Sequence, residues 1–215
     1  SDLSLLTKNT SPELTTNTLY RNDNGKFVDV TDKSGVGQYG FSIGVCVSDL
    51  NNDGWADIYV ANDFMLSDFM YINQKNGTFK NEVKQRTGHV PMFSMGVDIS
   101  DINNDLLPDV YVADMASEDH IRSKQNMGSM DVESFWQNIR MGEHYQFMFN
   151  CLQLNSSVGL FQEIAQLSGV AKTDWSWAPL FADLNNDGWK DLFISNGIPK
   201  RPNDLDYIDF IESEG

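Results

Sequence analysis

One acidic segment occurs three times in this chain of 215 residues, and it constrains the fold more than any other feature. The copies read DLNNDGWAD, DINNDLLPD and DLNNDGWKD, and they occupy residues 49–57, 101–109 and 183–191. The steps between their starts are therefore 52 and 82 residues. Self-similarity of this kind is typical of proteins that stack copies of one supersecondary unit.

A second, chemically unrelated marker keeps the same period. The segments LYRNDNGKF, MYINQKNGTF and LQLNSSVGLF each run from Asn through Gly to Phe, and these phenylalanines are Phe27, Phe79 and Phe161. Their spacing is again 52 and 82 residues. Two markers in step argue against the alternative, an all-β sandwich with coincidental self-similarity. The longer second step indicates an insertion between Met115 and Asn155.

The residues on either side of each acidic segment have the pattern of β-strands. On the N-terminal side, large apolar residues alternate with small ones, and small residues let another backbone approach closely. The large residues are Ile43, Val45, Val47, Met95, Val97, Ile99, Trp177, Pro179 and Phe181, and the small ones include Gly44, Gly96 and Ala178. On the C-terminal side, DIYVA, DVYVA and DLFIS are rich in β-forming residues, and each Asn-Gly-Phe segment fits a hairpin.

Four short antiparallel strands in each unit predict an all-β fold, a partial β-propeller of about three blades' worth of repeats with an α-helical insertion in one blade. A polar leader covers residues 1–17 and a tail covers 197–215. Because the first and last blade parts have unpaired edges, we expect a longer parent chain or edge pairing between chains. The expected blade parts are 18–31, 41–83, 93–165 and 175–196.

The insertion, residues 116–146, has the pattern of a helix rather than a strand. In DVESFWQNIRMG, Asp131 is a good N-cap and Gly142 a good C-terminal stop. The apolar residues between them share one helical face, namely Val132, Phe135, Trp136 and Ile139. The up-and-down connectivity places the insertion on the propeller face opposite the acidic segments. Two roles stay open, a cover for the propeller or a binding lid.

The acidic segments have the donor pattern of a calcium loop. In D-x-N-x-D-G-x-x-D, side-chain oxygens at positions 1, 3, 5 and 9 and a carbonyl at position 7 can surround a hard cation. An EF-hand needs Glu at position 12, where this chain has Val60, Val112 and Ile194, so we expect β-hairpin loops. The predicted ligands are Asp49, Asn51, Asp53, Trp55 and Asp57, then Asp101, Asn103, Asp105, Leu107 and Asp109, then Asp183, Asn185, Asp187, Trp189 and Asp191, with position 7 contributing its backbone carbonyl.

The second loop departs from this pattern. Leu106 replaces Gly and costs about 1–2 kcal/mol if its φ must be positive, and Pro108 restricts Leu107. Calcium is therefore predicted for the first and third loops and stays open for the second. Magnesium is less expected than calcium, because it demands tighter octahedral geometry. Zinc is not expected, because the three histidines lack the spacing of zinc ligands. The alternative is a turn rich in Asp and Asn that holds no metal.

Composition narrows the function. A net charge of −16 argues against nucleic acid as a partner, because phosphate binding needs a basic face. The sequence has no apolar run of 18 residues, so direct membrane insertion is not expected.

The segments GVCVSDLNNDGWADIYVANDF and LYRNDNGKFVDVTDKSGV resemble the FG-GAP or VCBS repeat of integrin α-subunit propellers. The resemblance extends over about residues 18–197 and is closer to the cartilage-acidic-protein (ASPIC/UnbV-associated) type of exported bacterial proteins. It implies a propeller with calcium loops, located outside the cell, at the cell surface or in the periplasm. It also implies that ligand binds on the face opposite those loops.

From these features we expect a non-catalytic, calcium-binding module for adhesion to a protein or polysaccharide ligand. Two alternatives remain, a polysaccharide lyase or hydrolase on a propeller scaffold, and a purely structural spacer. The enzyme would need paired carboxylates or a base outside the metal loops. The spare acids Asp63, Asp114, Glu118 and Glu143 show no pairing in the sequence.

Overall fold

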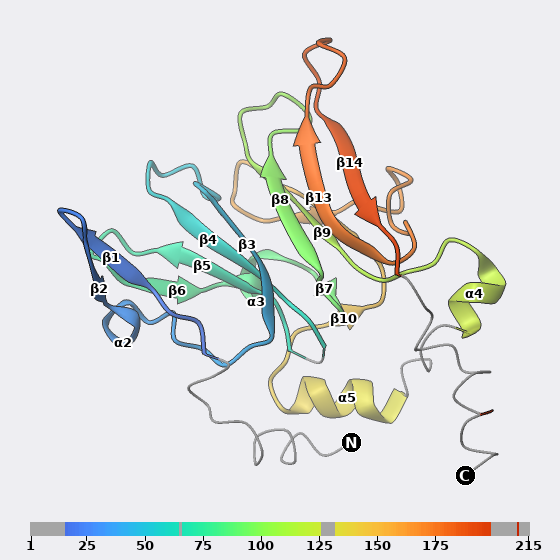
Figure 1. The fold of residues 1–215 in the computed structure, drawn as a ribbon, viewed down its shortest axis with the longest axis horizontal. Helices are drawn as coiled ribbons and strands as arrows, with labels where there is room; N and C mark the ends of the chain where they lie inside the picture. The colour runs from blue at the N-terminus through green and yellow to red at the C-terminus, as the bar shows by residue number, and fades with distance from the viewer. Residues whose placement is uncertain (1–15, 65, 126–131, 199–209, 211–215) are drawn as a thin grey trace.

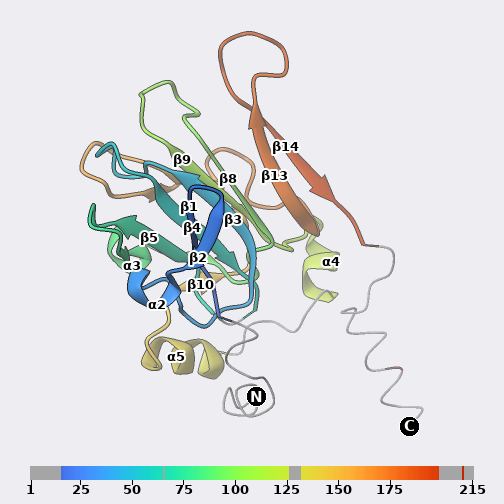
Figure 2. The same cartoon turned by 60° about the vertical axis from the view of Figure 1, so that its left-hand side comes forward.

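The structure is a computed structural model that describes residues 16–64, 66–125, 132–198 and 210. Most of the expected leader and tail lie outside these residues. The described chain consists mainly of small antiparallel sheets that follow one another side by side (Figures 1 and 2). None of its helices is long and apolar enough to cross a bilayer.

Two complete four-stranded sheets form the middle of the structure. Each is a meander in which every strand pairs antiparallel with the next strand of its sheet along the chain, as in a propeller blade. The first sheet contains β3 (Ser42–Ser48), β4 (Asp57–Asn62), β5 (Phe69–Asn73) and β6 (Phe79–Asn81). The second contains β8 (Gly96–Ser100), β9 (Asp109–Ala113), β11 (Cys151–Leu154) and β12 (Gln162–Glu163).

A two-stranded sheet flanks the complete sheets on each side (Figure 1). The N-terminal pair is β1 (Tyr20–Asp23) and β2 (Lys26–Asp29), and the C-terminal pair is β13 (Ser176–Ala182) and β14 (Asp191–Asn196). The β1–β2 turn has Asn24 at φ 54° and Gly25 at φ 90°, as a type I′ hairpin requires. The predicted fold class is confirmed, since these sheets make a partial β-propeller that does not close.

The inner strands pack in the order β3, β8, β13, and small residues set how closely they approach. A Cβ on Gly44 would lie 3.1 Å from the Cα of Gly96, and a Cβ on Gly96 would lie 3.3 Å from the Cα of Ala178. The large residues of each inner strand face the preceding sheet. Val97 packs on the core of the first sheet, and Phe181 packs on the core of the second.

Short helices follow the outer strands at matching repeat positions. They are α2 (Thr31–Ser34) after β2 and α3 (Val83–Arg86) after β6, and their first residues are again 52 apart. Val83 is buried in the core of the first sheet. The helices therefore belong to the repeat unit and close each outer hairpin over the core.

The insertion between β9 and β11 is helical, as expected. It contains α4 (His120–Gln125) and α5 (Val132–Arg140), and α5 is followed by Gly142 at φ 96°. Phe135 lies against Tyr145 and Phe147, with ring centroids 6.2 and 5.8 Å away. The chain after α5 forms β10 (Gln146–Phe147), which pairs parallel with β7 (Val90–Pro91). Figure 1 shows α5 at the end of the molecule opposite the acidic loops.

Candidate metal centre

The three acidic segments form the loops β3–β4, β8–β9 and β13–β14, which project from the same end of the sheets (Figure 1). Each loop connects the two inner strands of its blade. The predicted ligands at positions 1 to 7 therefore lie in hairpin loops at equivalent places in three units, and the aspartate at position 9 is the first residue of the strand that follows each loop. Because no helix flanks them, the loops differ from EF-hands in their surroundings as well as in position 12.

The first aspartate of each loop holds the turn together in the same way. Asp49 Oδ1 accepts a hydrogen bond from the Asp53 amide at 2.9 Å, and its Oδ2 accepts one from the Gly54 amide at 2.6 Å. In the second loop, Asp101 accepts from the amides of Asp105 and Leu106. In the third, Asp183 accepts from those of Asp187 and Gly188. The three segments thus share one local structure.

Positions 3 and 5 also repeat their contact. The side-chain nitrogen Nδ2 of Asn51 donates to Asp53 Oδ2 at 3.0 Å. The equivalent bonds from Asn103 to Asp105 and from Asn185 to Asp187 are both 2.9 Å. In the first loop, Oδ1 of Asn51 is buried and has no hydrogen-bond partner. A buried acceptor without a donor is rare, and a cation would satisfy it.

The aspartate at position 9 connects the loop to its sheet. Asp57 is fully buried, its Oδ2 accepts from the Leu50 amide at 2.9 Å, and its Oδ1 accepts from the Asn73 amide at 2.7 Å. Asp109 makes the same two bonds, with the amides of Ile102 and Asn155. Burial raises the pKa of Asp57 and of Asp109, and the neighbouring loop carboxylates raise it further. A cation would lower these pKa values by relieving that repulsion.

The left-handed backbone at position 6 is present in all three loops. Gly54 and Gly188 have φ values of 85° and 90°, and Leu106 has a φ of 68°. The strain expected from the sequence at Leu106 is therefore present. The Leu106 side chain is 82% exposed, so packing does not offset that strain. Position 4 is also left-handed, and there the residue is always asparagine, namely Asn52, Asn104 and Asn186.

The loop carboxylates accept hydrogen bonds from backbone amides, and in the first loop a lysine side chain also lies next to one of them. Lys75 Nζ lies 3.2 Å from Asp53 Oδ2, whereas the second unit has Ser157 at the equivalent position. Across the described ranges, no three His, Cys, Asp or Glu side chains converge in the arrangement of a bound ion. The donor types nevertheless fit calcium, because each loop supplies carboxylate and amide oxygens.

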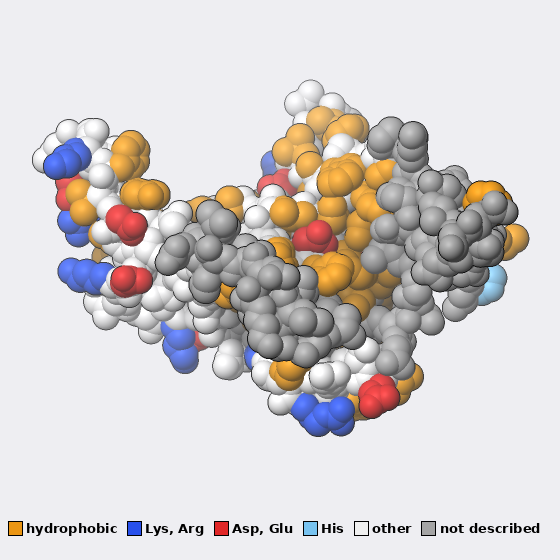
Figure 3. Space-filling view, turned by 60° about the horizontal axis from the view of Figure 1, so that its bottom comes forward, with side chains coloured by type: hydrophobic (Ala, Val, Ile, Leu, Met, Phe, Trp, Pro, Cys, Tyr) orange, Lys and Arg blue, Asp and Glu red, His pale blue; other side chains and the backbone are white. Residues whose placement is uncertain are grey.

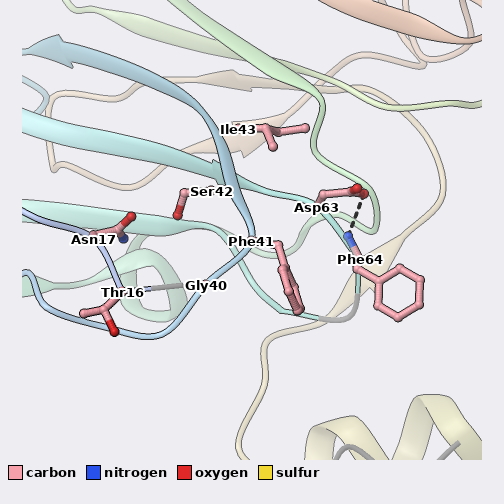
Figure 4. A pocket seen from close by; sticks show the side chains of 8 residues that line it. All are labelled: Thr16, Asn17, Gly40, Phe41, Ser42, Ile43, Asp63 and Phe64. Atoms are coloured by element: carbon pink, nitrogen blue, oxygen red, sulfur yellow. Dashed lines mark hydrogen bonds between the residues drawn. The ribbon is translucent and has the colours of Figure 1, made fainter. Parts of the chain in front are cut away.

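The opposite end of the first sheet holds a cavity that the sequence did not reveal. It has a volume of about 570 Å³ and lies where β3 begins and β4 ends, next to Phe41, Asp63 and Phe64 (Figure 4). Asp63 Oδ1 accepts from the Phe64 amide at 2.7 Å, and burial raises its pKa. Phe64 has a φ of 67° and is 44% exposed. No pattern in the sequence distinguishes this short connection from an ordinary loop.

The sequence also did not reveal that the buried carboxylates of Asp68 and Asp114 belong to the same contact of the repeat. In the first complete sheet the Asn62 amide donates to Asp68 Oδ1 at 2.9 Å, and in the second the Asp114 amide donates to Asn150 Oδ1 at 2.7 Å. The repeat alignment could have shown this exchange of Asp and Asn between matching positions. Burial raises the pKa of Asp68 and that of Asp114 to about 7.

The fold and the repeated loops define a repeat protein of the β-propeller class. The family model for the FG-GAP-like repeat matches residues 2–60 and 49–112, which together span just over half of the chain. The chain therefore belongs to the FG-GAP-like repeat family. Repeats of this family are typical of extracellular or exported proteins. No protein of curated function matches the chain.

Proposed function

We propose that this chain is a non-catalytic, calcium-stabilised propeller module of an exported or cell-surface protein, which binds a protein or glycan ligand. The observation that carries the proposal is the repetition of one carboxylate-rich turn, with the same internal hydrogen bonds, at three matched positions. Within each of these acidic clusters the carboxylates repel one another unless a cation lies close to them. Calcium prefers the carboxylate, amide and carbonyl oxygens that these loops supply.

The first and third loops are the better sites on this proposal. Both have Gly at position 6, so the turn can adjust around an ion without strain. The buried, unpartnered Oδ1 of Asn51 favours the first loop in particular. Lys75 competes there as a weak substitute, because an exposed ion pair contributes only about 0–1 kcal/mol. We expect calcium dissociation constants of about 10⁻⁴–10⁻³ M, the range of extracellular calcium-binding modules.

The buried acids support a binding role over a catalytic one. Asp68 accepts from the Asn62 amide and from the Tyr59 hydroxyl at 2.7 Å, and Asp114 accepts from the amides of Met92, Phe93 and Met115. Both side chains are fully buried. Groups occupied in this way stabilise the fold and are out of reach of a polymeric substrate.

The ligand face in this proposal is the end that carries the insertion. Val132 and Trp136 on α5 are 70% and 48% exposed, although their helix is otherwise anchored through Phe135. Exposed aromatic side chains on a helix suit contacts with proteins and with sugar rings. This face lies opposite the acidic loops, so calcium would act on the fold rather than touch the ligand (Figure 1).

One observation favours the enzyme alternative. Asp63 borders the 570 Å³ cavity and has a raised pKa, as a general acid does. Turnover of a polysaccharide panel that is lost in Asp63→Asn would support the enzyme. Binding without turnover, retained in Asp63→Asn and lost in Trp136→Ala, would support the module.

Terbium luminescence tests the metal sites separately. Trp55 and Trp189 occupy position 7 of the first and third loops and would sensitise a bound lanthanide, whereas the second loop has Leu107. We expect Trp55→Phe and Trp189→Phe each to remove part of the signal, and calcium to displace the ion. Asp53→Asn and Asp187→Asn serve as ligand variants. A signal that is absent, or unchanged in all four variants, would refute calcium binding at these loops.

A further inference from the structure

The chain that follows α5 crosses from the second unit to the first. Residues 143–149, which we call the strap, lie between α5 and the third strand of the second sheet, yet they contact the first unit. Glu143 Oε2 accepts hydrogen bonds from the amide and the hydroxyl of Ser67, at 3.0 and 2.6 Å. The His144 amide donates to the same hydroxyl at 2.8 Å. The strap therefore fixes the insertion to the link between β4 and β5.

The strap also covers an edge of the first unit. It contains β10, which pairs parallel with β7, and the carbonyls of Tyr145 and Phe147 accept from the amides of Val90 and Met92 at 3.0 and 3.1 Å. Phe135 of α5 packs on the strap through the rings of Tyr145 and Phe147. No residue of α5 is buried. If the strap detaches from β7, the helix therefore leaves with it.

One imidazole ring lies inside this contact on the strap itself. His144 is 7% exposed, and its Nε2 lies 3.1 Å from both the carbonyl and the hydroxyl oxygen of Thr87, directly after α3. The hydroxyl gives its own hydrogen to Val83 O, and a carbonyl has none to give. Nε2 therefore carries the hydrogen of the neutral ring. A second proton has to go to Nδ1, and it turns His144 into a buried cation.

A second imidazole ring faces the strap from the first unit. His89 directly precedes β7, and its ring centroid lies 5.1 and 5.3 Å from those of Phe147 and Phe149. Its Nε2 is buried and has no hydrogen-bond partner in the part of the chain that the structure describes. Protonation turns this nitrogen into a buried donor without an acceptor, which costs free energy.

The third histidine of the chain lies in different surroundings. His120, the first residue of α4, is exposed. Figure 3 turns the end with the insertion toward the viewer, and histidine is visible there at one place, at the right-hand edge. The chain thus offers an exposed histidine for comparison with the two rings at the strap.

The groups around the two rings oppose a second proton on balance. Burial lowers the pKa of His144, and Lys84 on α3 and the neighbouring His89 lower it further, whereas the hydrogen bond to the carbonyl and Glu143 raise it. Burial also lowers the pKa of His89, and Glu163 on β12 offsets only part of this effect. Both rings are therefore neutral while the strap is closed at neutral pH.

We infer that the strap is an acid-sensitive latch, in which protonation of His144 and His89 releases residues 143–149 and α5 from the first unit. In the open state both rings face water and take up protons at an ordinary pKa of about 6.5. The open state therefore binds more protons than the closed state as the pH falls below this value, and the equilibrium shifts toward it. Above this value both states hold neutral rings, and the strap stays closed.

The direction of the effect separates the latch from the buried acids. Asp68 and Asp114 have raised pKa values, so a fall in pH favours their buried, neutral forms and stabilises the fold. A local loosening at acid pH therefore does not come from them. The latch is also independent of what the insertion binds, so it stands or falls apart from the proposed binding role.

Hydrogen exchange of the full chain at pH 7.5 and pH 5.5 tests the latch without any ligand. The amides of Val90 and Met92 lose their acceptors when the strap opens. After correction for the intrinsic pH dependence of exchange, we expect their protection to fall by about tenfold or more, since each proton taken up shifts the equilibrium by up to about tenfold per pH unit. Protection within β4 should not fall. Unchanged protection of Val90 and Met92, or an equal fall in β4, would overturn the inference.

Histidine variants assign the effect to the two rings. His144→Gln keeps a donor for the Thr87 carbonyl, and His89→Phe keeps a ring against the strap, but neither side chain titrates. Each single variant should remove part of the acid effect and the double variant all of it, so the test does not depend on one variant folding. His120→Gln is the matched control and should keep the whole effect. An acid effect as large in the two single variants as in the unaltered chain would overturn the latch.

Discussion

The backbone carbonyl of Trp177 lies where any residue other than glycine at position 96 would place its Cβ. The two inner strands β8 and β13 can approach this closely because Gly96 has no side chain. Since β3 also packs on β8 through Gly44, the spacing of three successive sheets depends on two glycines.

Gly96→Ala should therefore destabilise the fold. The added methyl group meets backbone, which cannot rotate away, and overpacking of this kind costs about 1–3 kcal/mol. Urea unfolding measures the change. Gly88→Ala is the matched control, because a Cβ there has nothing within 4 Å. Equal stability of the two variants would show that the sheets slide apart without cost.

Leu106→Gly should have the opposite effect. The φ of 68° strains a leucine by about 1–2 kcal/mol, and glycine relieves it at the cost of some chain entropy. We expect a net gain of up to about 1 kcal/mol in the free energy of unfolding. Leu167→Gly, at an exposed residue whose φ is not positive, should instead lose stability. A loss at both positions would contradict the strain argument.

The stability of the fold should depend on pH because of two buried acids, Asp68 and Asp114. Their pKa values of about 7 in the folded state exceed the value near 4 of an unfolded aspartate, so the folded state binds more protons between these pH values. Their contribution to stability therefore falls as the pH rises from about 4 to about 7. Melting curves in chelator at pH 5 and pH 7.5 measure it.

Asp68→Asn should reduce this pH dependence. The amide oxygen can still accept from the Asn62 amide, and the hydroxyl of Tyr59 can accept from the new NH₂ group. Asp32→Asn, at an exposed residue on α2, is the control and should leave the slope unchanged. An Asp68→Asn variant with the full slope would place the titrating group elsewhere.

Removal of calcium should lower the melting temperature. An ion that binds only the folded state stabilises it by RT ln(1 + [Ca²⁺]/Kd), which is about 1.4 kcal/mol at ten times Kd. The double variant Asp53→Asn with Asp187→Asn should lose most of this shift. If chelator has no effect on the unaltered chain, the proposal of a calcium-stabilised module fails.

Phe135 and Trp136 on α5 should behave differently. Phe135 lies against Tyr145 and Phe147, so Phe135→Ala should loosen the helix and increase proteolysis within the insertion. Trp136 is 48% exposed, and Trp136→Ala should leave proteolysis unchanged while it weakens ligand binding. Equal proteolysis in both variants would show that Phe135 does not anchor the helix.

The sequence predicted the repeat, the all-β fold and the helical insertion because each has a local signature. Gly54, Gly188 and Asn24–Gly25 take the positive φ values that their residue types favour. The strain at Leu106 was also predictable, since the repeat alignment fixed its backbone conformation. Calcium in the loops stays a prediction.

Other features depend on contacts that have no periodic pattern. β7 and β10 contain two residues each and pair across a long stretch of chain, so neither propensity nor alternation indicates them. The Asp68 and Asn150 positions exchange residue type between repeats, which hides their common role from a search for identical residues. The cavity beside Asp63 arises from how two loops meet, and that depends on the whole fold.

The links between the second and third strands of the two complete sheets differ greatly in length, yet the same Asn–Asp clasp closes both. Asn62 with Asp68 closes the short link, and Asp114 with Asn150 closes the one that contains α4 and α5. The pairing of the second and third strands therefore does not depend on the length of the link between them. A foreign peptide or small domain grafted into the short link should be displayed without loss of the propeller, which makes that position a natural point for protein engineering.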